Sequence, residues 1–175
     1  MTSATHSDAT ARLAQIFEDE AEFVWRLLRR LGVGAADAED LTHEVFLTVW
    51  RKLESYDTSR PLRPWIAGIA VRICARFRRY ARNRYEVLAE SVVEHDLTAG
   101  AEEQLHAFRL LTEVMQPLDL ERRAIFVMHD VEGWSMPELA EALEIPLNTG
   151  YSRLRLARKQ VAEGIARLRQ QGADL

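Results

Sequence analysis

Apolar residues recur at spacings of three and four along most of the chain, and this periodicity predicts helices rather than strands. The first helix is expected over about residues 9–31, with Gly32 and Gly34 at its end, because glycine is favoured just past a helix C-terminus. Four residues at the helical spacing form its apolar face: Phe17, Ala21, Val24 and Leu28. This face is expected to pack in a core.

A second helix is expected from an N-cap at Asp37 to about Leu53. One apolar stripe follows it at the helical spacing: Leu41, Val45, Val49 and Leu53. Phe46 and Trp50 form a second stripe beside the first. Because two stripes are more than one inward face requires, part of this surface is expected to be available to a partner.

A loop is expected over residues 55–64, where Pro61 and Pro64 interrupt regular structure, and a third helix over about residues 65–84. One side of this helix is apolar: Ile66, Ile69, Ile73, Phe77 and Tyr80. The rest of its surface is cationic. Cys74, the only cysteine, lies near the edge of the apolar side, so we expect it to be buried and exclude an internal disulfide.

Residues 87–103 are acidic and weakly periodic, and we interpret them as a flexible linker. Asp119 is a good N-cap for a helix beyond the linker, and Ser135 with Glu138 has the spacing of a capping box. The helices expected in this half span about residues 102–115, 120–131, 136–143 and 147–170. The chain is therefore predicted to be all-α, with two small helical domains at residues 10–86 and 104–172.

The last two helices are joined by the turn Glu144-Ile145-Pro146 and have the form of a helix-turn-helix. In that motif the N-terminal residues of the second helix reach base edges in the major groove of DNA. Six side chains there are suited to bases or phosphates: Asn148, Thr149, Tyr151, Ser152, Arg153 and Arg155. An ordinary helical hairpin with a solvated basic face is the alternative interpretation.

Charge divides the chain more sharply than its total of −4 suggests. Residues 58–85 hold eight arginines and no acidic side chain, and residues 145–175 are also basic, at +4. Residues 1–57 carry −5 and residues 86–144 carry −11. Like charges crowded together repel, which favours an external polyanion such as nucleic acid. A solvated face, pairing with the acidic blocks, or a membrane-surface helix are the alternatives.

Candidate catalytic chemistry is sparse. Asp40, His43 and Glu44 could suggest a metal or acid–base site, but no second histidine or nucleophile accompanies them. His106 and His129 are isolated and interpreted as structural. There is no glycine-rich phosphate loop and no Ser/His/Asp arrangement. We therefore expect no enzyme activity, no metal and no cofactor.

Targeting signals are also not recognised in this sequence. The first ten residues are polar and lack a charged-then-apolar signal pattern. No apolar run approaches the roughly 20 residues that span a bilayer. We expect a reduced, cytoplasmic protein without membrane insertion.

Residues 37–50, from Asp37-Ala38-Glu39-Asp40 to Val49-Trp50, resemble the signature of domain 2 in bacterial sigma factors of the extracytoplasmic-function (ECF) group. Arg63-Pro64-Trp65-Ile66, followed by Ile69-Ala70, is similar to the promoter-melting segment of that family. Several later motifs look like domain 4: Pro117-Leu118-Asp119 to Phe126, Glu132-Gly133-Trp134-Ser135, Glu138-Leu139-Ala140, Ile145-Pro146, Thr149, and Ser152-Arg153-Leu154 with Ala157-Arg158. The resemblance covers about residues 12–85 and 104–170, in family order and at family spacing.

The resemblance implies a promoter-specificity subunit of RNA polymerase, with core polymerase, promoter DNA and an anti-sigma factor as partners. Domain 2 would bind core polymerase through Asp37, Asp40, His43, Glu44, Phe46 and Trp50. It would engage and melt the −10 element through Arg60, Arg63, Trp65, Arg72, Arg76 and Arg79. The helix-turn-helix of domain 4 would read the −35 element as duplex through the six residues named above.

Several positions depart from the family pattern. His43 stands where the family usually has Gln, and Arg72 and Arg76 stand where Asn and Asp are common. Asn148-Thr149-Gly150-Tyr151 replaces the usual Gly-Thr-Val-Lys. We expect these departures to leave polymerase binding intact and to affect which promoter sequence is recognised. The rival interpretations are a stand-alone helix-turn-helix regulator and, more distantly, a helical adaptor or anti-sigma-like binding protein.

Overall fold

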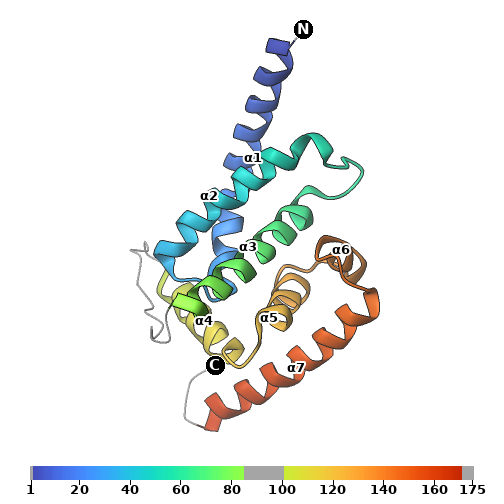
Figure 1. The fold of residues 1–175 in the computed structure, drawn as a ribbon. Coiled ribbons are helices and arrows are strands. Elements are labelled where there is room, and N and C mark those ends of the chain that lie inside the picture. The colour runs from blue at the N-terminus through green and yellow to red at the C-terminus, as the bar shows by residue number, and fades with distance from the viewer. Residues whose placement is uncertain (1, 85–100, 171–175) are drawn as a thin grey trace. The chain divides into compact units, whose positions relative to one another are not determined.

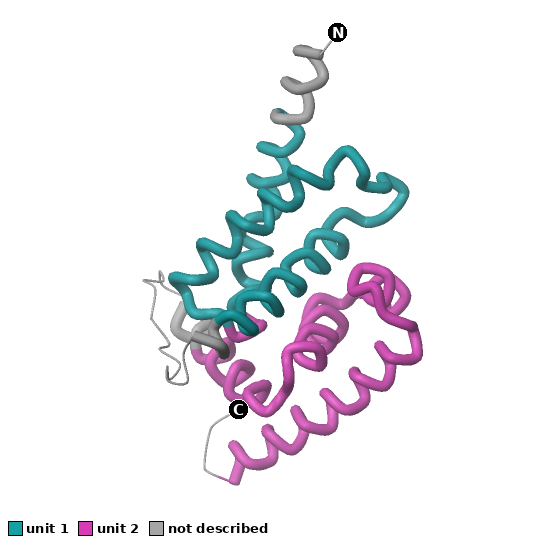
Figure 2. The backbone as a smooth tube through the Cα atoms, in the orientation of Figure 1, with its two compact units in different colours: residues 1–29, 33–89 teal, residues 30–32, 90–175 magenta. Residues whose placement is uncertain are grey.

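The computed structural model describes residues 2–84 and 101–170, and every regular element in these ranges is helical. The prediction of an all-α chain is confirmed. The chain divides into two compact units, residues 1–29 with 33–89 and residues 30–32 with 90–175 (Figure 2). Most of the expected linker, residues 87–103, lies outside the described residues. The domain limits 10–86 and 104–172 stay predictions.

The first unit is built from α1 (Thr2–Arg30), α2 (Ala35–Lys52), the short 3-10 helix η1 (Leu53–Ser55) and α3 (Leu62–Arg84) (Figure 1). Gly32 follows α1 with a φ of 88°, and the Val33 amide donates to the Leu28 carbonyl oxygen at 3.1 Å. This bond satisfies a carbonyl that the end of the helix leaves without a partner. The glycine at this helix end is therefore confirmed.

Helix α2 packs along α3 in the first unit (Figure 1). Most of the apolar residues expected to face inward are buried in its core. Its buried residues include Val24, Leu28, Leu41, Val45, Phe46, Val49, Leu53, Ile66, Ile69 and Ile73. Cys74 is fully buried, as expected. Tyr80, assigned to the apolar side of α3, is instead 71% exposed, so that assignment is wrong.

All three α-helices of this unit start earlier than expected. Helix α1 begins at Thr2 rather than at about residue 9. The N-cap of α2 is Gly34, with no side-chain cap, and Asp37 lies in the first turn. There its negative charge interacts favourably with the positive end of the helix dipole. Helix α3 begins at Leu62, so Pro64 lies inside it. Proline is tolerated in a first turn because the amide it lacks would have no helical partner there.

The second unit comprises α4 (Ala101–Met115), α5 (Leu120–Phe126), the π-helical turn η2 (Val127–Val131), α6 (Met136–Ala142) and α7 (Leu147–Gln170). Asp119 caps α5 by accepting a hydrogen bond from the Arg122 amide at 2.8 Å. Ser135 and Glu138 form the expected capping box at α6, and their hydrogen bonds lower the pKa of the Glu138 carboxyl. Both predicted caps are confirmed.

The helix expected over residues 120–131 changes character after Phe126. The Glu132 amide donates to the Val127 carbonyl oxygen at 2.9 Å, and the Trp134 amide donates to that of Met128 at 3.1 Å. These hydrogen bonds join residues more than four positions apart, whereas those of an α-helix join residues four positions apart. The turn is therefore wider than an α-helical turn, and Gly133, with a φ of 79°, ends it. Such π turns occur often at functional sites.

Candidate nucleic-acid interface and docking groove

Helix α7 separates a buried face from an exposed polar face. The buried face comprises Gly150, Leu154, Ala157, Val161, Gly164 and Leu168. On the opposite side, Asn148, Ser152, Arg155 and Lys159 are all exposed and lie at spacings of four, three and four. At 3.6 residues per turn these four side chains form one line, which we call the outer stripe. Lys159 was not among the expected DNA-binding residues, although its spacing from Arg155 could have found it.

Two arginines flank the buried face of α7. Arg153 forms an ion pair with Glu121 of α5, and its side chain is only 26% exposed. Arg158 lies on the other flank and is paired with Asp130 of η2. Arg153 was expected to read bases, but in this structure it is directed to a neighbouring helix and does not share the outer stripe.

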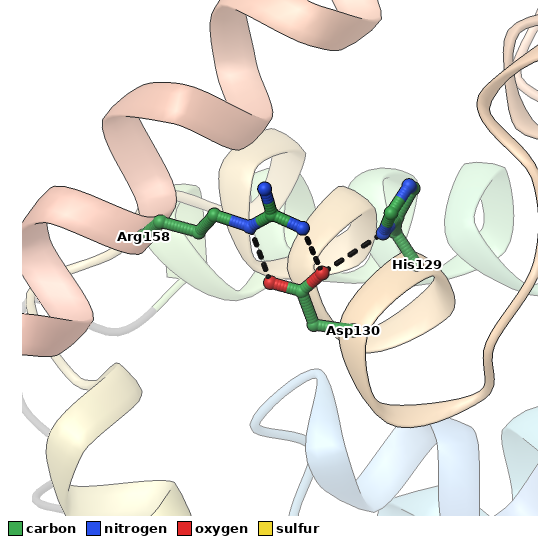
Figure 3. A network of polar contacts seen from close by, with 3 residues as sticks. All are labelled: His129, Asp130 and Arg158. Carbon is green, nitrogen blue, oxygen red and sulfur yellow. Dashed lines mark hydrogen bonds and ion pairs between the residues drawn. The ribbon is translucent and has the colours of Figure 1, made fainter.

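The Arg158 contact is part of a three-residue network (Figure 3). The Nε of Arg158 donates to Asp130 Oδ2 at 2.8 Å and its Nη2 donates to Oδ1 at 2.6 Å. His129 Nδ1 lies 2.8 Å from the same Oδ1. The Arg158 hydrogen bonds are the main cause of a lowered pKa of Asp130, and they raise the pKa of Arg158. His129 was expected to be isolated, and the network shows that this was wrong.

Gly150 explains one departure from the family pattern. A Cβ at this position would lie 2.5 Å from Met136 Sδ, closer than two unbonded atoms can approach. Met136 is itself 2% exposed. Glycine weakens a helix interior by about 1 kcal/mol relative to alanine, so its presence in α7 has a packing reason. A side chain at position 150 would therefore require Met136 to move.

The first unit holds the arginine-rich segment, and part of its charge is neutralised locally. Arg63 Nε lies 2.6 Å from Glu20 Oε2, and Arg60 lies 3.3 Å from Asp57. Arg76 is paired with Glu44, so a residue expected to bind DNA contacts one expected to bind polymerase. Internal pairing, one of the alternatives for the arginine block, is thus confirmed for these three residues.

The other expected −10 residues are arranged differently. Trp65 is half-buried, and its ring lies 4.5 Å from that of Tyr56. Arg72 is half-buried, whereas Arg79 is exposed and has no acidic partner among the described residues. Because the side chains of Arg60, Arg63 and Arg76 stay about half exposed in these ion pairs, phosphates can compete for these cations.

An apolar groove lies between α1 and α2 in the same unit. It has a volume of about 490 Å3 and is lined by Leu13, Phe17, His43, Phe46, Leu47 and Trp50. The Phe17 ring stacks on His43 at 6.3 Å and meets Phe46 edge-on at 4.8 Å. Leu47 is 57% exposed, more than a residue serving only the core needs to be. We call this feature the docking groove.

The docking groove brings together three of the six residues expected to bind polymerase: His43, Phe46 and Trp50. Asp37 and Asp40 are exposed on the same helix, and Glu44 is half-exposed in its pair with Arg76. Leu13, Phe17 and Leu47 were not expected there. The four-residue spacing of Leu13 and Phe17 was a visible signal, but their proximity to α2 required the tertiary structure.

Within residues 2–84 and 101–170, no three His, Cys, Asp or Glu residues are grouped as metal ligands. In the same ranges, no helix has the length and apolar character required to cross a membrane.

Comparison with known proteins identifies both halves of the chain. The family model for Sigma-70 region 2 matches residues 16–84, and that for Sigma-70, region 4 matches residues 108–161. The ECF RNA polymerase sigma factor SigL of Mycobacterium tuberculosis is 30% identical over 84% of this chain and 85% of its own length. The RNA polymerase sigma factor NccH of Alcaligenes xylosoxydans xylosoxydans is 27% identical over 92% and 95% of the two chains.

Solved structures agree on the fold. The sigma factor RpoE of Bartonella quintana, in complex with the anti-sigma factor NepR, matches with a TM-score of 0.72 at 20% identity, over 87% of this chain and 96% of that one. CnrH in complex with the cytosolic domain of CnrY matches with a TM-score of 0.65 at 21% identity, over 90% and 89%. From its two matched regions and its curated relatives, the chain belongs to the extracytoplasmic-function group of the sigma-70 family and is an RNA polymerase sigma factor.

Proposed function

We propose that each unit of this sigma factor carries a separate contact. The docking groove of α1 and α2, with Asp37, Asp40 and Glu44 beside it, binds core RNA polymerase. Helix α3 and the loop before it engage the −10 element and help to open it. The outer stripe of α7 reads the −35 element as duplex DNA. The factor has no catalytic activity of its own and acts in the cytoplasm, where it meets polymerase.

The docking groove is the observation that carries this proposal. An exposed apolar surface with an acidic rim is typical of a protein interface, where a desolvated centre is surrounded by polar side chains. A stand-alone regulator that binds only duplex DNA would have no need of it. The groove also lies on the helix whose residues resemble the core-binding signature of the family.

The −10 assignment rests on the arginine-rich surface of α3 and its loop. Opening a promoter requires bases to be unstacked, at a few kcal/mol for each flipped base. Exposed cations such as Arg79 attract the backbone, and aromatic side chains such as Trp65 can receive an unstacked base. The assignment predicts contact with single-stranded as well as duplex DNA.

We also propose an anti-sigma partner for this chain. One structural neighbour, RpoE, was solved in complex with the anti-sigma factor NepR. A second, CnrH, was solved in complex with the cytosolic domain of CnrY. An exposed apolar groove on a factor that competes for polymerase is a surface that an inhibitor can cover.

Leu47→Asp tests the docking groove. Leu47 is exposed, so the variant is expected to fold, but its carboxylate would be desolvated in an apolar interface. We expect affinity for core polymerase to fall by at least about tenfold, measured by biolayer interferometry with immobilised core. Ala36→Asp adds the same charge to an exposed position of α2 outside the groove and is the matched control. Equal affinity of the two variants would contradict the assignment.

A further inference from the structure

Two large apolar side chains are exposed at the start of α7. Leu147 is 43% exposed and Tyr151, one turn later, is 52% exposed. Neither belongs to the buried face of the helix, which begins at Gly150 and Leu154. Tyr151 also stands where the family usually has lysine, so an aromatic ring replaces a positive charge beside the outer stripe.

The neighbouring groups indicate what this apolar pair contacts. Arg155 follows Tyr151 by one turn and has no acidic partner within the described residues, and Asn148 and Ser152 lie on the adjacent stripe. The nearby carboxylates of Glu121 and Asp130 are engaged by Arg153 and Arg158. A surface with a free cation and uncharged hydrogen-bonding groups is complementary to DNA rather than to an acidic protein.

Within the major groove, the apolar feature offered by a base edge is the C5-methyl group of thymine. We propose that Tyr151, with Leu147 beside it, is a specificity-determining residue that packs against a thymine methyl group in the −35 element. This inference rests on the proposed reading of that element by α7. It names a base preference that a lysine at the same position would not create, because a lysine ammonium group seeks phosphate or a guanine edge.

The packing of α7 supports a fixed position for the ring. Tyr151 directly follows Gly150, where the backbone of α7 lies so near the Met136 side chain of α6 that a Cβ would come within 2.5 Å of its sulfur. A side chain on a rigid helix start, rather than on a loop, presents the same surface to each DNA sequence. Because its position is fixed, the Tyr151 ring can favour one base over another by direct contact.

The test uses the full-length chain assembled with core polymerase. Promoter duplexes randomised at the upstream element are selected for binding, and each enriched thymine is then replaced by deoxyuridine, which lacks only the methyl group. We expect one position at which this replacement weakens wild-type binding by about fourfold, the effect of one buried methyl group. Tyr151→Ser should abolish that sensitivity, and Tyr151→Phe, which retains the ring, should preserve it.

Three outcomes would overturn the inference. Wild-type binding could be insensitive to deoxyuridine at every enriched thymine, or Tyr151→Ser could remain as sensitive as the wild type. Tyr151→Ser could instead weaken assembly with core polymerase in the absence of DNA, which would assign the pair to a protein contact. Failure of the underlying function has a different signature, because the wild-type holoenzyme would then enrich no upstream element at all.

Discussion

Helices α3 and α7 are both rich in arginine, but their ion pairs lie in different places. On α7, Arg153 and Arg158 pair with α5 and η2 at the two edges of the buried face, and Arg155 remains available on the outer stripe. On α3, Arg63 and Arg76 pair with Glu20 and Glu44 while about half exposed to solvent. The arginine ion pairs of α7 lie beside its outer stripe, whereas those of α3 lie on its exposed cationic surface. The outer stripe itself carries one exposed ion pair, between Lys159 and Glu163 at 4.0 Å.

This difference fits the two kinds of DNA contact proposed for the two helices. A duplex reader needs a helix held in a fixed orientation, because base discrimination depends on side-chain placement within the groove. A segment that engages opening DNA needs cations that exchange partners as the backbone moves, and exposed ion pairs of at most about 1 kcal/mol allow that exchange. The proposal therefore gives arginine a positioning role in one unit and an exchangeable role in the other.

The largest predicted effect concerns the position of α7. Gly150→Val restores the common family residue but places its side chain against Met136, which is buried and has little room to move. We expect a loss of about 1–3 kcal/mol in unfolding free energy, typical of overpacking, together with weaker −35 binding. Thermal unfolding and holoenzyme binding would measure the two effects. Met136→Ala in the same chain should restore part of both, and an additive loss instead would refute the packing explanation.

Arg155→Ala and Arg153→Ala distinguish the outer stripe from its flank. If Arg155 contacts a base, its removal should cost about 1–3 kcal/mol of −35 binding and relax the preference at one base pair. Arg153→Ala should lower thermal stability instead and leave the base preference unchanged, because its partner is Glu121. Competition binding with single-base variants of the selected element would measure the preference. The reverse assignment of these effects would show that Arg153 leaves Glu121 to read DNA.

Acid unfolding tests the Asp130–Arg158 pair. Hydrogen bonds from Arg158 lower the pKa of Asp130 below its ordinary value of 3.8, so the folded protein keeps this carboxylate ionised where the unfolded chain would protonate it. The stabilisation is therefore present above about pH 4 and lost as the pH falls through the folded pKa. Asp130→Asn should flatten this part of the melting-temperature profile. Parallel profiles for the wild type and the variant would mean that the pair contributes nothing.

The smallest effect is predicted for α3. Glu20→Gln releases Arg63 from its partner, so we expect −10 DNA binding to strengthen by up to about fivefold at low salt and to converge with wild type at high salt. Glu18→Gln removes the same charge from an exposed position of α1 and is the matched control. If both variants bind DNA with equal affinity, the change in net charge accounts for the effect. The ion pair with Glu20 would then not limit DNA binding by Arg63.

Local sequence signals identified much of the fold. The glycine at Gly32, the N-cap at Asp119 and the capping box at Ser135 depend on residues close together in sequence, and the structure confirms all three. The π turn at residues 127–131 escaped prediction, because its apolar spacing resembles that of an α-helix and the difference lies in the backbone hydrogen bonds.

The candidate sites were predicted less completely because they combine distant segments. The second apolar stripe on α2 indicated a partner surface, but the docking groove also needs Leu13 and Phe17 of α1. The charge of Arg153 was visible in the sequence, whereas its pairing with Glu121, 32 positions earlier, depends on how α5 packs on α7. Charge pattern alone therefore located the basic helices but did not show which arginines form ion pairs with neighbouring helices.

The central claim is that this chain directs core RNA polymerase to promoters through contacts made by both units. Transcription in vitro, with core polymerase, the full-length chain and a template carrying the selected −35 and −10 elements, tests it most directly. We predict initiation at a defined start only when both proteins are present, with loss on replacing either element. Binding of the chain to the −35 duplex with no association with core and no promoter-dependent transcript would contradict the claim.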